Sequence, residues 1–246
     1  ATGIVFAGAN YPGTNDPHGT EGSPGIFTPV HQHIFSARLD VAVDGEDNTI
    51  HEIDVKQLPT GPANPYGNAF TWEATQLKSE SEAQRLAKGE VNRVWEVRSA
   101  HRTNLVDKPT SYWLLPEGKA TLLARPDSTV YARGNFATKH LWVTQYAEGE
   151  LYPAGDYPNQ HAGWAGLPTW TEADRNLDGE DLVLWHSFGF THIPRTEDWP
   201  IMPVDYSGFW FKPHGFLNQN PTMDLPSGVT ESSCASDGGG SCHAEA

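Results

Sequence analysis

The sequence is poor in cysteine, in basic residues and in long apolar runs. Its 246 residues contain two cysteines, Cys234 and Cys242, both near the C-terminal end, so disulfides cannot form the framework of the fold. No apolar run approaches the roughly 18 residues of a transmembrane helix. Lysine and arginine total 16 against 31 acidic residues, which gives a net charge of −15. This balance argues against nucleic acid and against an anionic membrane surface as partners.

The composition favours strands over helices. Glycine (24) and proline (19) are abundant, and aromatic residues make up 11% of the chain, a mixture typical of short strands joined by turns. We therefore predict an all-β protein with a β-sandwich architecture, loops at 7–29 and 57–69, and one short helix at 79–87. The Gly/Ser-rich segment 227–246 is predicted to be a flexible tail. The predicted strands are 30–44, 50–55, 91–99, 111–115, 120–123, 130–136, 139–146, 181–185 and 209–211.

The triplet His31-Gln32-His33, inside a predicted strand, carries the most chemical information. Alternate side chains of a strand share a face and stand about 6.6 Å apart, so both imidazoles can reach one metal ion. Imidazole suits copper, zinc, iron and nickel. A third histidine would complete a redox or Lewis-acid site. His192, which follows a buried-looking strand, is a candidate, but the composition does not choose it over His186 or His161.

Cupin barrels offer an alternative, because they also carry His-x-His on a strand. Their next ligand is usually a glutamate four or five residues later. Ala37 and Arg38 occupy those positions here, which argues against a metal-dependent dioxygenase or hydrolase of that kind.

Four longer stretches closely resemble the copper amine oxidases, the quinone-dependent primary amine oxidases. They are FTPVHQHIFSARLD (27–40), FATKHLWVT (136–144), YPAGD (152–156) and HIPRTEDWPIMPVD (192–205). The resemblance covers nearly the whole chain except its tail. It implies that residues 1–226 are the C-terminal portion of the catalytic domain, a large antiparallel β-sandwich that is incomplete in this chain.

The resemblance also implies two metal sites. Cu(II) would be bound by His31, His33 and His192, with Met202 just outside the coordination shell. A structural cation, Ca²⁺ or Mn²⁺, would take the carboxylates and backbone carbonyls of a second group: Asp40, Val41, Asp181 and Leu182. Many family members have a further aspartate two residues after the first. Ala42 stands there in this sequence, which implies a weak or empty second site.

The family's topaquinone cofactor forms from a tyrosine in the motif Thr-x-x-Asn-Tyr-Asp/Glu. The nearest match, residues 7–12, has Ala7 in place of the threonine and Pro12 in place of the acid, so we expect Tyr11 to be an ordinary loop tyrosine. The quinone tyrosine and the catalytic aspartate base are therefore expected upstream, on a preceding segment or on a separate polypeptide.

The resemblance implies a definite reaction for the completed protein. A primary amine, O2 and water would give an aldehyde, ammonia and H2O2, once an upstream N-terminal polypeptide completes the domain. A dimer of completed protomers is implied as well. The alternative is a non-catalytic copper-binding fragment that lacks the quinone. The residues indicate neither the substrate amine nor the cellular compartment.

Overall fold

The computed structural model describes residues 3–4, 8–9 and 17–226. Tyr11, the tail 227–246 and both cysteines lie outside the described residues. The secondary structure is dominated by antiparallel strands. The strands are β1 (Gly3–Ile4), β2 (Gly8–Ala9), β3 (Gly19–Ser23), β4 (Ile26–Pro29), β5 (His31–Val41), β6 (Asn48–Gln57), β7 (Phe70–Leu77), β8 (Val94–Thr103), β9 (Pro109–Pro116), β10 (Leu141–Gln145), β11 (Asp178–Glu180), β12 (Leu182–His192), β13 (Ile201–Met202) and β14 (Phe209–His214). The helical segments are α1 (Thr129–Arg133), α2 (Leu167–Trp170) and the 3-10 turns η1 (Gly89–Val91), η2 (Asn135–Thr138), η3 (Pro158–Gln160), η4 (Thr171–Ala173), η5 (Thr196–Asp198) and η6 (Pro221–Asp224).

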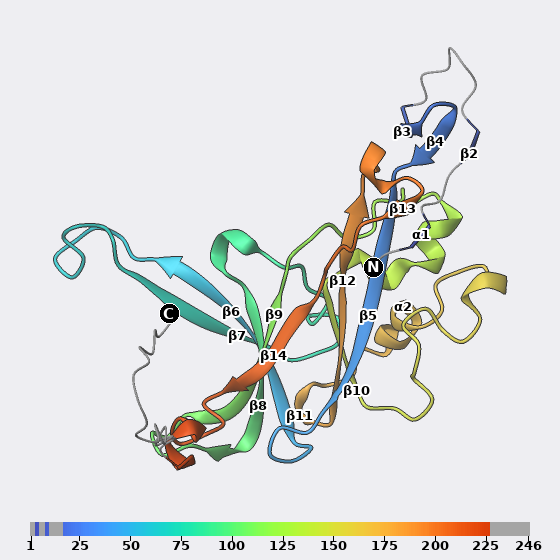
Figure 1. Ribbon diagram of the computed structural model, residues 1–246. Helices are drawn as coiled ribbons and strands as arrows, with labels where there is room; N and C mark the ends of the chain where they lie inside the picture. The colour runs from blue at the N-terminus through green and yellow to red at the C-terminus, as the bar shows by residue number, and fades with distance from the viewer. Residues whose placement is uncertain (1–2, 5–7, 10–16, 227–246) are drawn as a thin grey trace, which may run out of the picture.

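Two sheets form the body of the molecule (Figure 1). One has the order β10-β12-β5, and the other has the order β11-β6-β8-β9-β14 with β7 paired to β6. A single apolar cluster takes side chains from both sheets, so the sheets pack face to face as a sandwich. The cluster consists of Val41, Val43, Ile50, Leu77, Ala83, Trp95, Val97, Leu114, Leu141, Val143, Leu177, Leu182 and Leu184. The predicted all-β sandwich is confirmed.

Strand β12 is buried on both faces. Leu182 and Leu184 point into the core between the sheets, while Val183 and Trp185 pack on the other face under α2. Because successive side chains of a strand alternate between faces, this requires an almost continuous apolar run, and the run is present in the sequence. The predicted strand at 181–185 is therefore correct but too short.

The ladder between β5 and β12 is long and regular. It pairs Val41 with Leu182 at one end and His31 with His192 at the other. In Figure 1 the histidine end of these strands runs past the second sheet, toward β13 and the small sheet β2-β4-β3. The side chains at this end therefore lie outside the main core.

Three local predictions were wrong. Residues 79–87 form no helix: the segment makes isolated bridges through Ser79 and Arg85. Residues 120–123 form no strand, because side-chain bonds from Gln32 hold this segment instead of a ladder. Residues 130–136 are helical, because Ser128 caps α1 by accepting a hydrogen bond from the backbone N–H of Tyr131.

Two further differences concern the loops. The predicted loop 7–29 contains β2, β3 and β4 among its described residues. The strand β7 was not predicted, although the loop 57–69 before it was. Strands β6 and β7 form a long hairpin that projects from the body (Figure 1). In the described part of the chain, no helix has the length and apolar character needed to span a bilayer.

Candidate metal centre

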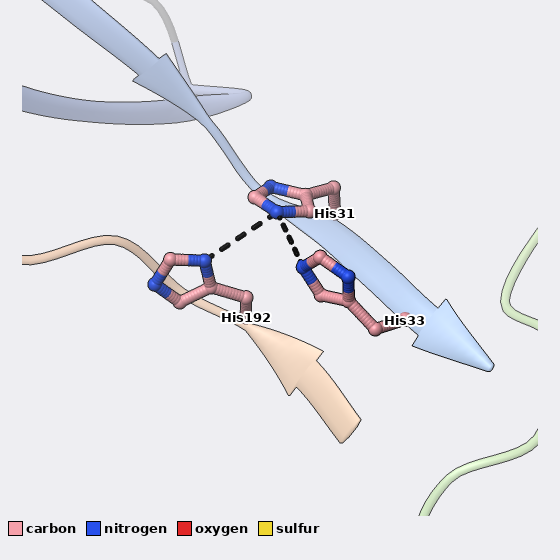
Figure 2. A group of neighbouring side chains, drawn as sticks. All are labelled: His31, His33 and His192. Carbon is pink, nitrogen blue, oxygen red and sulfur yellow. Dashed lines mark hydrogen bonds between the residues drawn. The ribbon is translucent and has the colours of Figure 1, made fainter. Parts of the chain in front are cut away.

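His31, His33 and His192 converge at the end of the β5–β12 ladder. His31 and His33 lie on one face of β5, and the register places His192 of β12 directly opposite His31. Figure 2 shows the three rings turned toward one another. One nitrogen from each ring lies within 4.8 Å of the others. Among the described residues, this is the one group of three or more potential side-chain ligands close enough to share an ion.

The outer nitrogens of two rings have acceptors that fix their protons. Nδ1–H of His31 donates to the carbonyl oxygen of Pro29 at 2.9 Å, and Nε2–H of His192 donates to Oδ2 of Asp198 at 2.9 Å. A neutral imidazole has one N–H, so the inner nitrogens, Nε2 of His31 and Nδ1 of His192, carry lone pairs. These two nitrogen atoms lie 3.4 Å apart. A cation placed between the two nitrogens would accept both lone pairs.

The inner distances fit metal binding by imidazole. Zinc–imidazole bonds are about 2.0–2.1 Å, so two nitrogens at right angles around an ion lie about 2.9 Å apart. Nε2 of His31 and Nε2 of His33 are 2.9 Å apart. Burial, followed by repulsion from His31 and His192, lowers the pKa of His33. The neutral form, which is the ligating form, is therefore favoured.

Asp198 is almost fully buried beside His192. It is 2% exposed, and it accepts further hydrogen bonds from the backbone N–H of Arg195 at 2.9 Å and from Nη2 of Arg195 at 3.0 Å. Burial opposes the charged form of Asp198, but the bonds from Arg195 and His192 outweigh it and lower the pKa to about 2. Asp198 is therefore a carboxylate at neutral pH.

Two residues bring the ligand strands together. Gln32, between the two histidines of β5, uses its side-chain amide to bond Thr191 Oγ1, the carbonyl of Thr121 and the backbone N–H of Leu123. Gly189 of β12 has a φ of +152°, and a Cβ there would overlap the carbonyl of His33. A larger residue would push the two strands apart at the site.

A depression of about 390 Å³ opens beside His192. Its lining includes Arg195, Asp198 and the buried Met202. Met202 therefore lines the same depression as His192, and its place just outside a copper coordination shell stays a prediction.

The other candidate third ligands lie elsewhere. His186 is buried in the core, where its Nδ1–H donates to the carbonyl of His140 at 2.7 Å. His161 follows η3, and its carbonyl accepts from Arg133. Neither belongs to the group around His31. Geometry thus selects His192 from the alternatives that the sequence left open.

The predicted ligands of the second cation lie at the opposite end of the same ladder. Val41 pairs with Leu182, and Asp40 pairs with Val183, next to Asp181. Burial, followed by the negative charges of Asp40 and Glu46, raises the pKa of Asp181. An ion between the carboxylates would offset this repulsion. Asp40 also forms an ion pair with Arg38 at 3.0 Å, which competes for the same carboxylate. The second site stays a prediction.

Sequence reasoning missed Asp198 and Gln32. The available signal for Asp198 was weak: an acidic residue shortly after His192 and Pro194, in a segment with no helical or strand period. Only the turn η5, in which Arg195 and Asp198 bond each other, brings the carboxylate back to the imidazole. Gln32 offered no signal beyond its position between two histidines.

Comparisons with known proteins identify the family. The family model "Copper amine oxidase, enzyme domain" matches residues 1–232. Histamine oxidase of Arthrobacter globiformis is 53% identical over 92% of this chain and 33% of its own length. Copper methylamine oxidase of Arthrobacter sp. (strain P1) is 41% identical over 94% of this chain and 35% of its own. The crystal structure of a copper-containing benzylamine oxidase from Hansenula polymorpha superimposes with a TM-score of 0.86 at 34% identity, covering 92% of this chain and 36% of that one. The chain spans about a third of the length of these relatives, and it belongs to the copper amine oxidase family, within the enzyme domain.

Proposed function

We propose that this chain is the copper-binding portion of a primary amine oxidase, which converts an amine, O2 and water to an aldehyde, ammonia and H2O2. Cu(II) is bound by His31, His33 and His192. The observation that supports this most directly is the convergence of one ring nitrogen from each of the three imidazoles within 4.8 Å, with the lone pairs of His31 and His192 directed inward. Family membership supports the reaction class.

The residues of this chain have separable tasks in that proposal. The three imidazoles bind the ion, and the β5–β12 ladder holds them in register. Pro29 and Asp198 keep the outer protons of His31 and His192 in place, so the inner nitrogens of these two rings stay available. When bound, Cu(II) supplies a Lewis acid and redox centre for forming the quinone and for reducing oxygen. Met202 lines one wall of the depression beside His192.

Topaquinone, the tyrosine that forms it and the aspartate base would come from an upstream segment or a separate chain. The surroundings of the site support such a partner. Ile193 and Val204 line the depression beside His192 and are 66% and 53% exposed, although both are large and apolar. A packed segment would remove this surface from water. We further propose a dimer of completed protomers, and a weak Ca²⁺ or Mn²⁺ site at Asp40 and Asp181.

Phenylhydrazine labelling of the purified protein, with everything that copurifies, tests the proposal. A visible quinone band that shifts on forming the hydrazine adduct is expected, together with copper near one ion per copy of this chain. Intact mass should also show material beyond the 27.0 kDa of this chain. Copper without a quinone band would instead support the non-catalytic fragment.

His192→Ala tests the ligand assignment. The variant should lose copper and form no quinone, because two imidazoles on one strand leave the ion without its cross-strand ligand. Elemental analysis measures the copper and absorbance measures the quinone. His161→Ala, at a histidine outside the group, is the control and should keep both. Normal copper content in His192→Ala would refute the assignment.

A further inference from the structure

One face of the ladder between β5 and β12 carries a row of facing rings. Alternate residues of a strand share a face, so every second cross-strand pair lies on the same side of the sheet. Three successive pairs on this side consist of rings: His31 with His192, His33 with Phe190, and Phe35 with Phe188. The middle pair therefore joins a proposed copper ligand to an aromatic side chain that has no atom to bind a metal.

His33 is held differently from the other two proposed ligands. His31 and His192 each place an outer nitrogen against a hydrogen-bond acceptor, the carbonyl of Pro29 and the carboxylate of Asp198. Within the described part of the chain, His33 has no acceptor of this kind, and a phenyl ring lies against it instead. The ring centroids of His33 and Phe190 are 4.9 Å apart, and the ring planes are tilted by 31°.

We propose that Phe190 is a positioning residue for the metal centre, which orients the imidazole of His33 by ring packing and stabilises that imidazole when an ion is bound. This inference rests on the proposed copper site. Aromatic rings prefer offset or tilted contacts with centroids about 4.5–7 Å apart, and this pair meets that condition. Phe190 is 7% exposed, so its own ring is confined by the surrounding structure. The packing therefore favours the orientation in which Nε2 of His33 lies 2.9 Å from Nε2 of His31.

Metal binding should strengthen the contact between these two rings. An imidazole that donates its lone pair to Cu(II) becomes electron-poor, whereas the face of a phenyl ring carries partial negative charge. A positive group within about 6 Å of a phenyl centroid is attracted to the ring, and the attraction is stronger where water is excluded. Phe190 should therefore favour the loaded site over the metal-free one, and Cu(II) over the less charged Cu(I).

Two substitutions remove the ring and leave all three histidines in place. Phe190→Leu keeps a branched apolar side chain, and Phe190→Met fills the space with a longer, unbranched one. Copper affinity should fall about 2- to 10-fold in each variant, the range expected for the loss of one aromatic pair. The Cu(II)/Cu(I) reduction potential should rise in each, because the more highly charged ion loses more of the attraction.

Phe188→Leu is the matched control. The rings of Phe188 and Phe35 are 5.8 Å apart and tilted by 34°, so this pair resembles the contact between Phe190 and His33 but includes no proposed ligand. Phe188→Leu should lower the free energy of unfolding of the metal-free protein, as Phe190→Leu does, because each variant loses a ring contact. It should leave the copper affinity and the reduction potential at their wild-type values.

The experiment uses the complete enzyme, stripped of metal and reloaded with Cu(II). Chelator competition gives the affinity, spectroelectrochemistry gives the reduction potential, and the Cu(II) paramagnetic resonance spectrum reports on the ligand field. Denaturant unfolding of the metal-free protein gives the stability of each variant. A purely structural role for Phe190 would lower the stability and leave the potential and the resonance spectrum unchanged. If Phe190→Leu does not fold, Phe190→Met decides the question.

The outcomes separate this inference from the proposed function. Wild-type protein that binds no copper would overturn both. Copper-loaded wild type with the same affinity and potential in the Phe190 variants would overturn the role of Phe190 alone, and so would equal shifts in Phe188→Leu. Weaker copper binding and a higher potential in the Phe190 variants, with both values unchanged in Phe188→Leu, are the result expected.

Discussion

Gly189→Ala should disrupt the candidate metal centre without changing any of the three histidines proposed as ligands. Gly189 faces Ile34 across the ladder. A Cβ there would lie 3.0 Å from the carbonyl carbon of His33 and from Cα of Ile34, and closer still to the carbonyl oxygen of His33. Carbon atoms in good contact are about 3.5–4.0 Å apart, so the strands must separate by at least about 0.5 Å. That movement acts directly on the backbone of a proposed copper ligand.

The loss of folding stability in Gly189→Ala has two parts. A non-glycine residue at a φ of +152° costs about 1–3 kcal/mol, and overpacking against β5 costs about 1–3 kcal/mol more. Together they approach the smaller values of total stability typical of a domain, about 5–15 kcal/mol. Gly45→Ala separates the two parts, because Gly45 has a φ of +119° and open space where the Cβ would be. Gly45→Ala should carry the backbone cost alone.

Denaturant unfolding of the metal-free protein and copper titration of each variant measure these effects. Gly189→Ala should unfold at lower denaturant than Gly45→Ala, and it should bind copper more weakly. Gly45→Ala should bind copper as the wild type does, because its turn lies at the far end of β5. Equal stability of the two variants, with normal copper affinity in Gly189→Ala, would refute the reasoning.

Two further predictions concern residues outside the proposed ligand set. Gln32→Leu removes the side-chain amide that hydrogen-bonds the carbonyl of Thr121, the N–H of Leu123 and Thr191 Oγ1. The free energy of unfolding, measured by chemical denaturation, should therefore fall by about 1–3 kcal/mol. An unchanged denaturation midpoint would contradict this. Burial lowers the pKa of His186 to about 4, so the folded protein keeps the ring neutral while the unfolded chain takes up a proton below about pH 6.5. Because of His186, the free energy of unfolding of metal-free protein should therefore fall by about 3 kcal/mol as the pH is lowered from 6.5 to 4. His186→Gln should make the free energy of unfolding less dependent on pH in this range. The same pH dependence in the variant would exclude the ring as the cause.

The site strands could be predicted because their signals are local. An apolar run predicts the doubly buried start of β12, and the period of a strand predicts that His31 and His33 share a face. The choice of His192 is different. It depends on a register between strands far apart in sequence, which no local pattern records. The family resemblance pointed to His192, and the geometry then set His186 and His161 aside.

The wrong elements were decided by tertiary contacts. The segment 79–87 has good helix formers, but Glu80 is fully buried, with Oε1 2.7 Å from Nε of Arg175. Arg85 forms a bidentate ion pair with Glu52. A helix could not place both side chains on these distant partners. Strand β7 escaped prediction for the opposite reason, because it is an edge strand with mostly exposed side chains.

The core of the sandwich and the metal centre depend on the same register. His31 meets His192 only in the pairing that also sets Val41 opposite Leu182. A slip of one residue would turn the side chains of one strand to the opposite face and separate the imidazoles. Such a slip would also turn Leu184 out of the core between the sheets and turn Trp185 into it. Both faces of β12 are already filled by packed side chains. The apolar residues at the core end of the ladder therefore fix the position of the three histidines at its other end.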